Sequence, residues 1–139
     1  MYSNYILMLG DMLDIKTGKF VKLNDLKDGE TLVLKSGKKQ YKKEIKSNLT
    51  QECMVLNNMS CDLTFIDEKD INNYYVSSGC YIITLKDEYK GKVLLKYLFF
   101  VITSMLLDHI KNLRHGSLQQ FISKNDLIKF FSKVKTVSV

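Results

Sequence analysis

The stretch Val93-Leu-Leu-Lys-Tyr-Leu-Phe-Phe-Val-Ile-Thr-Ser-Met-Leu-Leu-Asp-His-Ile-Lys-Asn-Leu113 decides the fold class. Its apolar residues recur at intervals of three and four, which is the period of an α-helix. Lys111 and Arg114 suit the negative end of a helix dipole, and Gly116 tolerates the left-handed conformation of a cap, so we expect the helix to end there. The pattern predicts one long helix whose apolar face packs on a sheet.

Short apolar runs upstream of this helix predict the sheet. They are rich in β-branched and aromatic residues and are bounded by turn signals. The turn dipeptide Asp28-Gly29 precedes the first of them, and a polar connection at 57–60 joins two runs that we expect to form an antiparallel pair. The opening segment, 5–19, is a helix or a strand that ends at a turn. The predicted strands are residues 30–34, 53–56, 63–66, 74–76 and 81–85.

The C-terminal part predicts two more elements. Ser123 can cap a further helical turn, and residues 134–139 alternate as a short strand does. The chain has 139 residues, the length of one compact domain. We therefore expect a single α+β domain over residues 1–139, with a twisted mixed sheet backed by one long helix.

The charge balance favours a polyanion as partner. Lys and Arg number 21 against 15 Asp and Glu, a net charge of +6. Arg114 is the only arginine, and lysine suits phosphates better than bidentate reading of bases. Residues 35–46 form the most basic segment, with six lysines against Glu44. Its alternative interpretation is a merely solvated loop.

Several classes of protein are disfavoured. The 3 cysteines include no close-spaced pair and follow no signal peptide, so free thiols in an intracellular protein are expected. The longest uncharged stretch, 97–107, is too short to span a membrane. Neither a nucleotide loop nor a methyltransferase motif is present, so we expect no enzyme activity, no cofactor and no metal.

The order of these segments resembles the target-recognition domain of type I restriction-modification enzyme specificity (S) subunits, from Leu9 to Phe130. The resemblance lies in the Gly-containing opening, a strand that runs into a Ser-Gly loop, a later strand, the start of the main helix and the closing segment. These segments are 9–19, 32–37, 76–86, 95–100, and 116–120 followed by 122–127. The loop at 57–60 departs from the family because it lacks the usual glycines.

The resemblance implies a non-catalytic module that binds double-stranded DNA. Family members carry two such domains separated by long paired helices, which hold methyltransferase subunits. Nothing after Phe131 predicts such an arm. This module is therefore expected to act as a monomer, as a homodimer, or with a methyltransferase-like or scaffold partner.

Candidate DNA contacts lie in the loops between the predicted strands and after the long helix. Lysine side chains are expected to bind phosphates, while Ser, Asn and Gln side chains probe base edges. Gln40 can pair with adenine in the major groove. The candidates are Lys35, Ser36, Gly37, Lys38, Lys39, Gln40, Lys42, Lys43, Lys46, Asn57, Asn58, Ser77, Ser78, Arg114 and Gln119.

Two other functions remain as alternatives. Glu88 and Lys90 form the Glu-x-Lys spacing of many restriction nucleases, with Asp70 as an upstream acid, although a surface charge pair explains them as well. A protein-interaction module that keeps the fold without reading DNA is the other. His109 and His115 lie off one helical face and have no cysteine nearby, so zinc is not expected.

Overall fold

A four-stranded antiparallel sheet forms the middle of the protein. The computed structural model describes residues 5–37 and 40–138. The strand order in this sheet is β2-β8-β5-β6, and every neighbouring pair is antiparallel. The expected hairpin is confirmed, with Cys53 opposite Ile66. The strands are β2 (Leu13–Thr17), β5 (Cys53–Asn57), β6 (Leu63–Ile66) and β8 (Cys80–Leu85).

Strand β5 is buried on both faces, which makes it the centre of two cores. Side chains alternate across a strand, so neighbouring residues enter opposite layers. Met54 and Leu56 pack towards the helices, whereas Cys53 and Val55 pack towards a second sheet. A run of four buried apolar residues is typical of a strand covered on both sides.

The second sheet has the strand order β4-β3-β7. Its strands are β3 (Asp28–Leu34), β4 (Tyr41–Lys43) and β7 (Tyr74–Val76). β7 runs parallel to β3 and β4 antiparallel to it, so the mixed pairing expected from the sequence occurs in this sheet. The predicted turn at Asp28-Gly29 is wrong, because both residues belong to β3, next to an irregularity in its register with β4. A Cβ on Gly29 would lie 2.6 Å from the Glu44 nitrogen, so the strands approach closely there.

The long helix is confirmed, but it ends earlier than expected. It consists of α2 (Leu95–Val101), a π-helical segment η4 (Ile102–Leu106) and α3 (Leu107–Lys111). Leu95, Leu98, Ile102 and Ile110 are its fully buried side chains. Gly116 does not cap the helix, because the helix ends at Lys111.

The ends of the chain complete the helical layer. The opening segment forms β1 (Tyr5–Met8), α1 (Leu9–Met12) and then β2. The predicted C-terminal elements are confirmed as α4 (Lys124–Phe131), capped by Ser123, and β9 (Lys135–Ser138), which pairs with β1. Short 3-10 helices lie in the connections: η1 (Leu23–Asp25), η2 (Glu68–Asn73) and η3 (Asp87–Tyr89).

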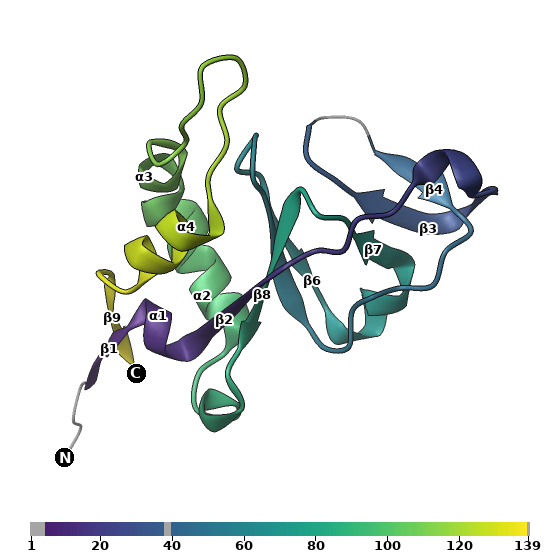
Figure 1. Cartoon of the computed structure of the whole chain (residues 1–139). Helices are drawn as coiled ribbons and strands as arrows, with labels where there is room; N and C mark the ends of the chain where they lie inside the picture. Colours follow the sequence, from purple (N-terminus) through teal and green to yellow (C-terminus); the bar gives the residue numbers. More distant parts are fainter. Residues whose placement is uncertain (1–4, 38–39, 139) are drawn as a thin grey trace.

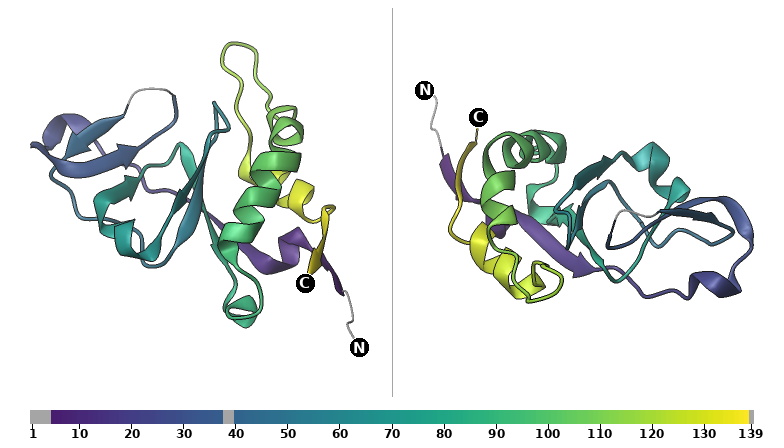
Figure 2. Two further views of the ribbon diagram at one scale, coloured as in Figure 1. Left: turned by 180° about the vertical axis from the view of Figure 1, so that it is seen from behind. Right: turned by 90° about the horizontal axis from the view of Figure 1, so that it is seen from above.

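The elements form three layers: the helices, the four-stranded sheet and the three-stranded sheet (Figure 1 and the right view of Figure 2). The α+β class with a long helix on a sheet is confirmed. All 3 cysteines are free and buried. No helix within residues 5–37 and 40–138 is long and apolar enough to cross a membrane.

Candidate nucleic-acid interface

Four connections lie at one end of the molecule, which we call the loop end. It lies uppermost in Figure 1 and in the left view of Figure 2. The connections are the β3–β4 loop (residues 35–40), the β5–β6 turn (residues 58–62), the β7–β8 turn (residues 77–79) and the α3–α4 loop (residues 112–123). Most of the candidate DNA-binding residues belong to these connections, so the fold brings together segments that are far apart in sequence.

Asn57 joins the first two connections. Its Nδ2 donates hydrogen bonds to the carbonyl oxygens of Lys35 at 3.0 Å and Gly37 at 3.1 Å. Its Oδ1 accepts hydrogen bonds from the backbone nitrogens of Met59 at 3.0 Å and Ser60 at 3.2 Å. The carboxamide is therefore occupied within the protein, and its role is to fix the β3–β4 loop against the β5–β6 turn.

The β7–β8 turn is bound to both neighbours. The backbone nitrogen of Asn58 donates to the Gly79 oxygen at 3.1 Å, and that of Ser77 donates to the Leu34 oxygen at 2.8 Å. A Cβ on Gly79 would lie 2.4 Å from the Ser36 side chain, so only glycine allows this close packing. Ser77 is buried, which removes its side chain from the surface, whereas Ser78 is exposed.

Arg114 bonds the α3–α4 loop to the β5–β6 turn. Its Nη1 donates to the Met59 oxygen at 3.0 Å, and its Nε donates to the Lys111 oxygen at 3.0 Å. The backbone nitrogen of Ile122 also donates to the Asn58 oxygen at 2.8 Å. The only arginine thus contributes to the geometry of the loop end, and two of its donors are already used.

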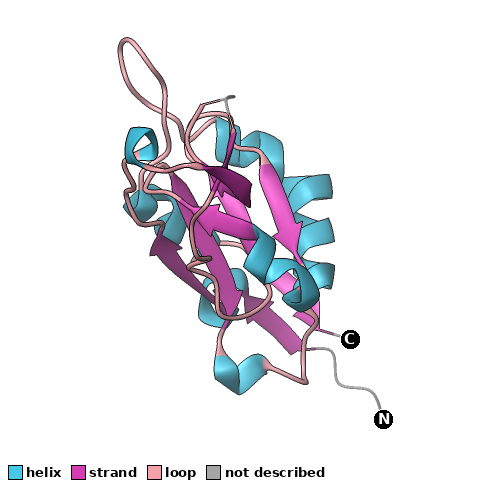
Figure 3. Ribbon diagram, turned by 90° about the vertical axis from the view of Figure 1, so that its right-hand side faces the viewer, coloured by secondary structure: helices cyan, strands magenta, loops and turns pink. Residues whose placement is uncertain are grey.

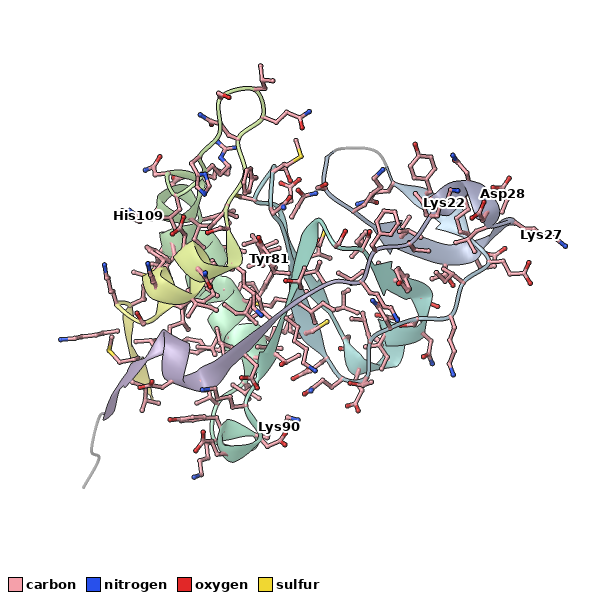
Figure 4. The ribbon with its side chains drawn as sticks, in the orientation of Figure 1. Lys22, Lys27, Asp28, Tyr81, Lys90 and His109 are labelled. Atoms are coloured by element: carbon pink, nitrogen blue, oxygen red, sulfur yellow. The ribbon has the colours of Figure 1, made fainter. Side chains whose placement is uncertain are left out.

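Asn58 and Tyr81 lie beneath these turns. The Tyr81 hydroxyl donates to the Ile122 oxygen at 2.7 Å, and Figure 4 shows its ring between the sheet and the helices. Burial raises the pKa of Tyr81, while a hydrogen bond with the Asn58 side chain acts in the opposite direction. The Oδ1 of Asn58 is buried, with no partner among the described residues. That oxygen is not presented to a ligand at the surface.

Several candidate side chains stay exposed or half-buried at and near the loop end, and Lys35 and Gln40 among them line a pocket. Gln40, Lys42, Ser78 and Gln119 are exposed, and Lys35 is half-buried with its Nζ 5.4 Å from the centre of the Tyr41 ring. A pocket of about 200 Å³ opens between the β3–β4 loop and the central sheet. Its polar lining comes from Lys35, Gln40, Asn57, Asp62 and Thr64. Ser36 and Gly37 are half-buried beside it, and Lys38 and Lys39 lie outside the described residues.

Two predicted lysines are placed differently from the rest. Lys43 Nζ lies 3.2 Å from Asp28 Oδ1, and its side chain is only 17% exposed, so it forms an ion pair that belongs to the second sheet. The segment that carries Lys46 turns away from the loop end after β4 (Figure 1). Ser47 then bonds the Ile71 oxygen at 2.7 Å. The basic run is therefore split between the loop end and the body of the protein.

The lysine proposed for a nuclease is paired with a neighbouring carboxylate in the connection that contains η3. Lys90 Nζ lies 2.6 Å from Asp87 Oδ1, and the hydrogen bond and charge of this lysine lower the pKa of Asp87. Figure 4 places Lys90 at the end of the molecule opposite the loop end. Among residues 5–37 and 40–138, no group of three or more His, Cys, Asp or Glu side chains is placed to hold a metal ion.

Comparisons with known proteins give a likeness of fold. No protein-family model matches the sequence, and no curated protein matches it. Among solved structures, it is similar to the crystal structure of the type I restriction-modification system S subunit from M. genitalium, with a TM-score of 0.74 and 16% sequence identity. The chain has the fold of part of an S subunit. The match covers 97% of this chain and 34% of that chain, so the protein spans about a third of the subunit's length.

Sequence reasoning missed the exposed tip of the α3–α4 loop. Leu118 is 97% exposed there and stands next to the candidate Gln119. The signal was an isolated leucine among polar residues after a glycine. An isolated leucine of this kind does not by itself predict a binding site, because single exposed apolar residues are common on protein surfaces.

Proposed function

We propose that this chain is an intracellular, non-catalytic module that binds double-stranded DNA through its loop end. The observation that carries the proposal is the hydrogen-bonded joining of the connections that the sequence singles out, in a fold shared with part of an S subunit. Loops that are already ordered lose less conformational entropy when they bind. A preformed polar surface of this kind suits a long polyanion.

The free side chains divide into two classes of contact. Lys35 and Lys42 are suited to phosphate oxygens, whereas Gln40, Ser78 and Gln119 can exchange hydrogen bonds with base edges. Asn57 and Arg114 support these groups from beneath through their bonds to the loop backbones. We therefore propose contact by the exposed groups and positioning by the bonded ones.

The net charge of +6 favours the same partner. Lysine contacts displace counterions from DNA, so affinity should fall steeply with salt. A module that spans about a third of the solved S subunit presents one such surface. We propose that a second copy, or a methyltransferase-like or scaffold partner, supplies a second contact surface where a longer site is bound.

A protein-interaction role is the second candidate, because apolar side chains are exposed along the outer side of the long helix. Leu94 is 75% exposed, Phe100 55% and Met105 69%. Such a group often marks a contact with another protein. It lies on the helical layer rather than on the loops, so binding a partner there is compatible with binding DNA at the loop end.

The deciding experiment is a salt titration of binding to a labelled duplex. We expect binding at low salt and a linear fall of the logarithm of affinity with the logarithm of salt concentration. Absence of binding at low salt, with the protein folded, would leave the protein-interaction role. Incubating plasmid with protein and magnesium should leave the DNA uncut, and cleavage that is lost in Glu88→Ala and Lys90→Ala would restore the nuclease alternative.

A further inference from the structure

The α3–α4 loop projects beyond the other connections of the loop end (Figure 3). Residues 116–120 form its tip, and all of them are exposed. Leu118 is 97% exposed, the largest value among the exposed large apolar residues of the described chain. A leucine exposed to this degree makes no contribution to the core, so its apolar surface is available to a ligand.

The stem of this loop is well held. His115 and Phe121 exchange backbone hydrogen bonds of 2.8 and 2.9 Å, and their rings lie 4.7 Å apart. Gly116 has a φ of +135°, and a Cβ on it would lie 2.3 Å from the Gln119 oxygen. Only glycine permits this tight return of the chain. The tip is therefore presented on a closed stem rather than on an extended linker.

The stem is also joined to the rest of the loop end. Arg114 and Ile122, one on each strand of the stem, bond the backbone of the β5–β6 turn at 3.0 and 2.8 Å. His115 Nε2 lies 3.5 Å from Asp126 Oδ2 in α4. A ligand that contacts the tip of this loop meets Leu118 together with the exposed Gln119 and Gln120 that follow it.

The chemistry of the tip matches one kind of base pair. Leu118 offers an apolar surface, and the side chains of Gln119 and Gln120 next to it each offer one acceptor and two donors. In the major groove an A·T pair presents the thymine C5-methyl group together with the adenine N6 and N7, and glutamine pairs with adenine at those two atoms. A G·C pair has no methyl group there.

We propose that the α3–α4 loop enters the major groove, where Leu118 packs on thymine methyl groups and an adjacent glutamine pairs with adenine. This inference rests on the proposed DNA-binding function and adds a base preference to it. The preference is for A·T pairs and is independent of the phosphate contacts made by lysine.

The test removes the methyl group and the leucine separately. The probes are an alternating A·T duplex, the same duplex with deoxyuridine in place of thymidine, and an alternating G·C duplex, all of one length. Removing one methyl from a buried contact should weaken binding by about fourfold. We expect the parent protein to prefer the thymidine duplex to the deoxyuridine duplex by about this factor, and Leu118→Ala to bind the two equally with an unchanged salt slope.

Leu94→Ala is the matched control. It makes the same chemical change at a side chain that is 75% exposed just before α2, whose N-terminal end lies away from the loop end (Figure 1). It should keep the preference for thymidine. Leu118→Met should keep it as well, because methionine is unbranched but still covers an apolar methyl group.

Three results would overturn the inference while the proposed function stands. One is equal binding of the thymidine and deoxyuridine duplexes by the parent protein. Another is a preference that survives in Leu118→Ala. The third is an equal loss of affinity for both duplexes in Leu118→Ala, as a wedge in the minor groove would give. A parent protein that binds none of the three duplexes would overturn the proposed function itself and this inference with it.

Discussion

The two ends of the molecule both carry lysine-bearing turns, yet their side chains are used differently. At the loop end, Asn57 and Arg114 bond the backbones of neighbouring connections, and Lys42, in β4 just after the β3–β4 loop, remains exposed. At the opposite end, Lys90 pairs with Asp87 inside a single turn at 2.6 Å. Lysines that are equivalent in composition therefore differ in what they can bind.

The difference shows that charge alone does not mark an interface. In the turn that contains η3, the Asp87 carboxylate balances the charge of Lys90. Among the described residues, the one hydrogen bond from this turn to a distant segment is from the Lys86 nitrogen to the Met12 oxygen, at 2.8 Å. At the loop end, several segments share one hydrogen-bonded network. The loop end differs from the η3 turn because it combines this network with an exposed lysine.

The largest expected effect comes from removing the group that joins the loops. Asn57→Ala deletes four hydrogen bonds in a half-buried site, each with a net contribution of about 0.5–1.5 kcal/mol. We expect the free energy of unfolding in urea to fall by about 2–4 kcal/mol. DNA affinity should fall as well, because the β3–β4 loop and the β5–β6 turn lose their common support.

Asn73→Ala, at an exposed position in η2, provides the control and should change the free energy of unfolding by less than about 0.5 kcal/mol. If Asn57→Ala proved as mild as this control, the loop end would not be a jointly stabilised unit. The contrast between the two ends would then be lost.

The next effect separates the lysines of the two ends. The double variant Lys35→Ala, Lys42→Ala should bind duplex DNA about tenfold more weakly, with a salt slope lower by roughly 1.8, since each phosphate contact contributes about 0.9. The double variant Lys90→Ala, Lys92→Ala carries the same change of charge at the opposite end. Fluorescence anisotropy over a range of salt concentrations should leave its slope unchanged, and equal slopes for both variants would contradict the proposed interface.

A smaller effect distinguishes two adjacent lysines of β4. Lys43 belongs to an ion pair with Asp28, whose side chain is 95% exposed, so Lys43→Met should lower the free energy of unfolding by only about 0.5–1 kcal/mol and leave DNA affinity nearly unchanged. Lys42→Met should do the reverse, weakening binding without loss of stability. The two measurements are chemical denaturation and duplex binding, and exchanged outcomes would mean that β4 faces DNA with its other side.

The smallest expected effect concerns the reactivity of two thiols, Cys53 and Cys80, which lie at opposite ends of the core between the two sheets. Burial raises the pKa of Cys53 and of Cys80 to about 12, with the Glu52 charge adding to the effect at Cys53. Both thiols should react slowly with iodoacetamide at pH 8 in the native protein and quickly in urea. Faster labelling of Cys80, next to the β7–β8 turn, would mean that the loop end opens locally.

The same thiols set a pH dependence. In the unfolded chain they lose their protons near the ordinary value of 9.0, whereas in the folded protein they keep them to about 12. The unfolded state therefore binds fewer protons above about pH 9, so stability is unaffected by these groups below that pH and falls as the pH rises through this range. Denaturation midpoints at pH 8 and pH 10 would check the sign, with a Cys53→Ala, Cys80→Ala variant as control.

Local patterns predicted most elements but not how the strands are shared between sheets. The runs that became β5, β6, β7 and β8 were predicted from their β-branched and aromatic content. β7 and β8 are separated only by residues 77–79, yet they belong to different sheets. Pairing partners are set by contacts between distant segments, and no local pattern contains that information. β4 was missed because three residues with two lysines have little strand character.

The candidate site shows the same division. Composition and turn signals determined where polar and basic residues concentrate, and the resemblance to target-recognition domains agrees with the fold of the solved S subunit. Only the tertiary structure decided which of those residues are free. Asn57 and Arg114 became supports, Ser77 was buried and Lys43 was paired, because each lies beside a partner from a distant segment. Sequence specifies the chemistry of a side chain, whereas its availability depends on which partners the fold places within hydrogen-bond distance.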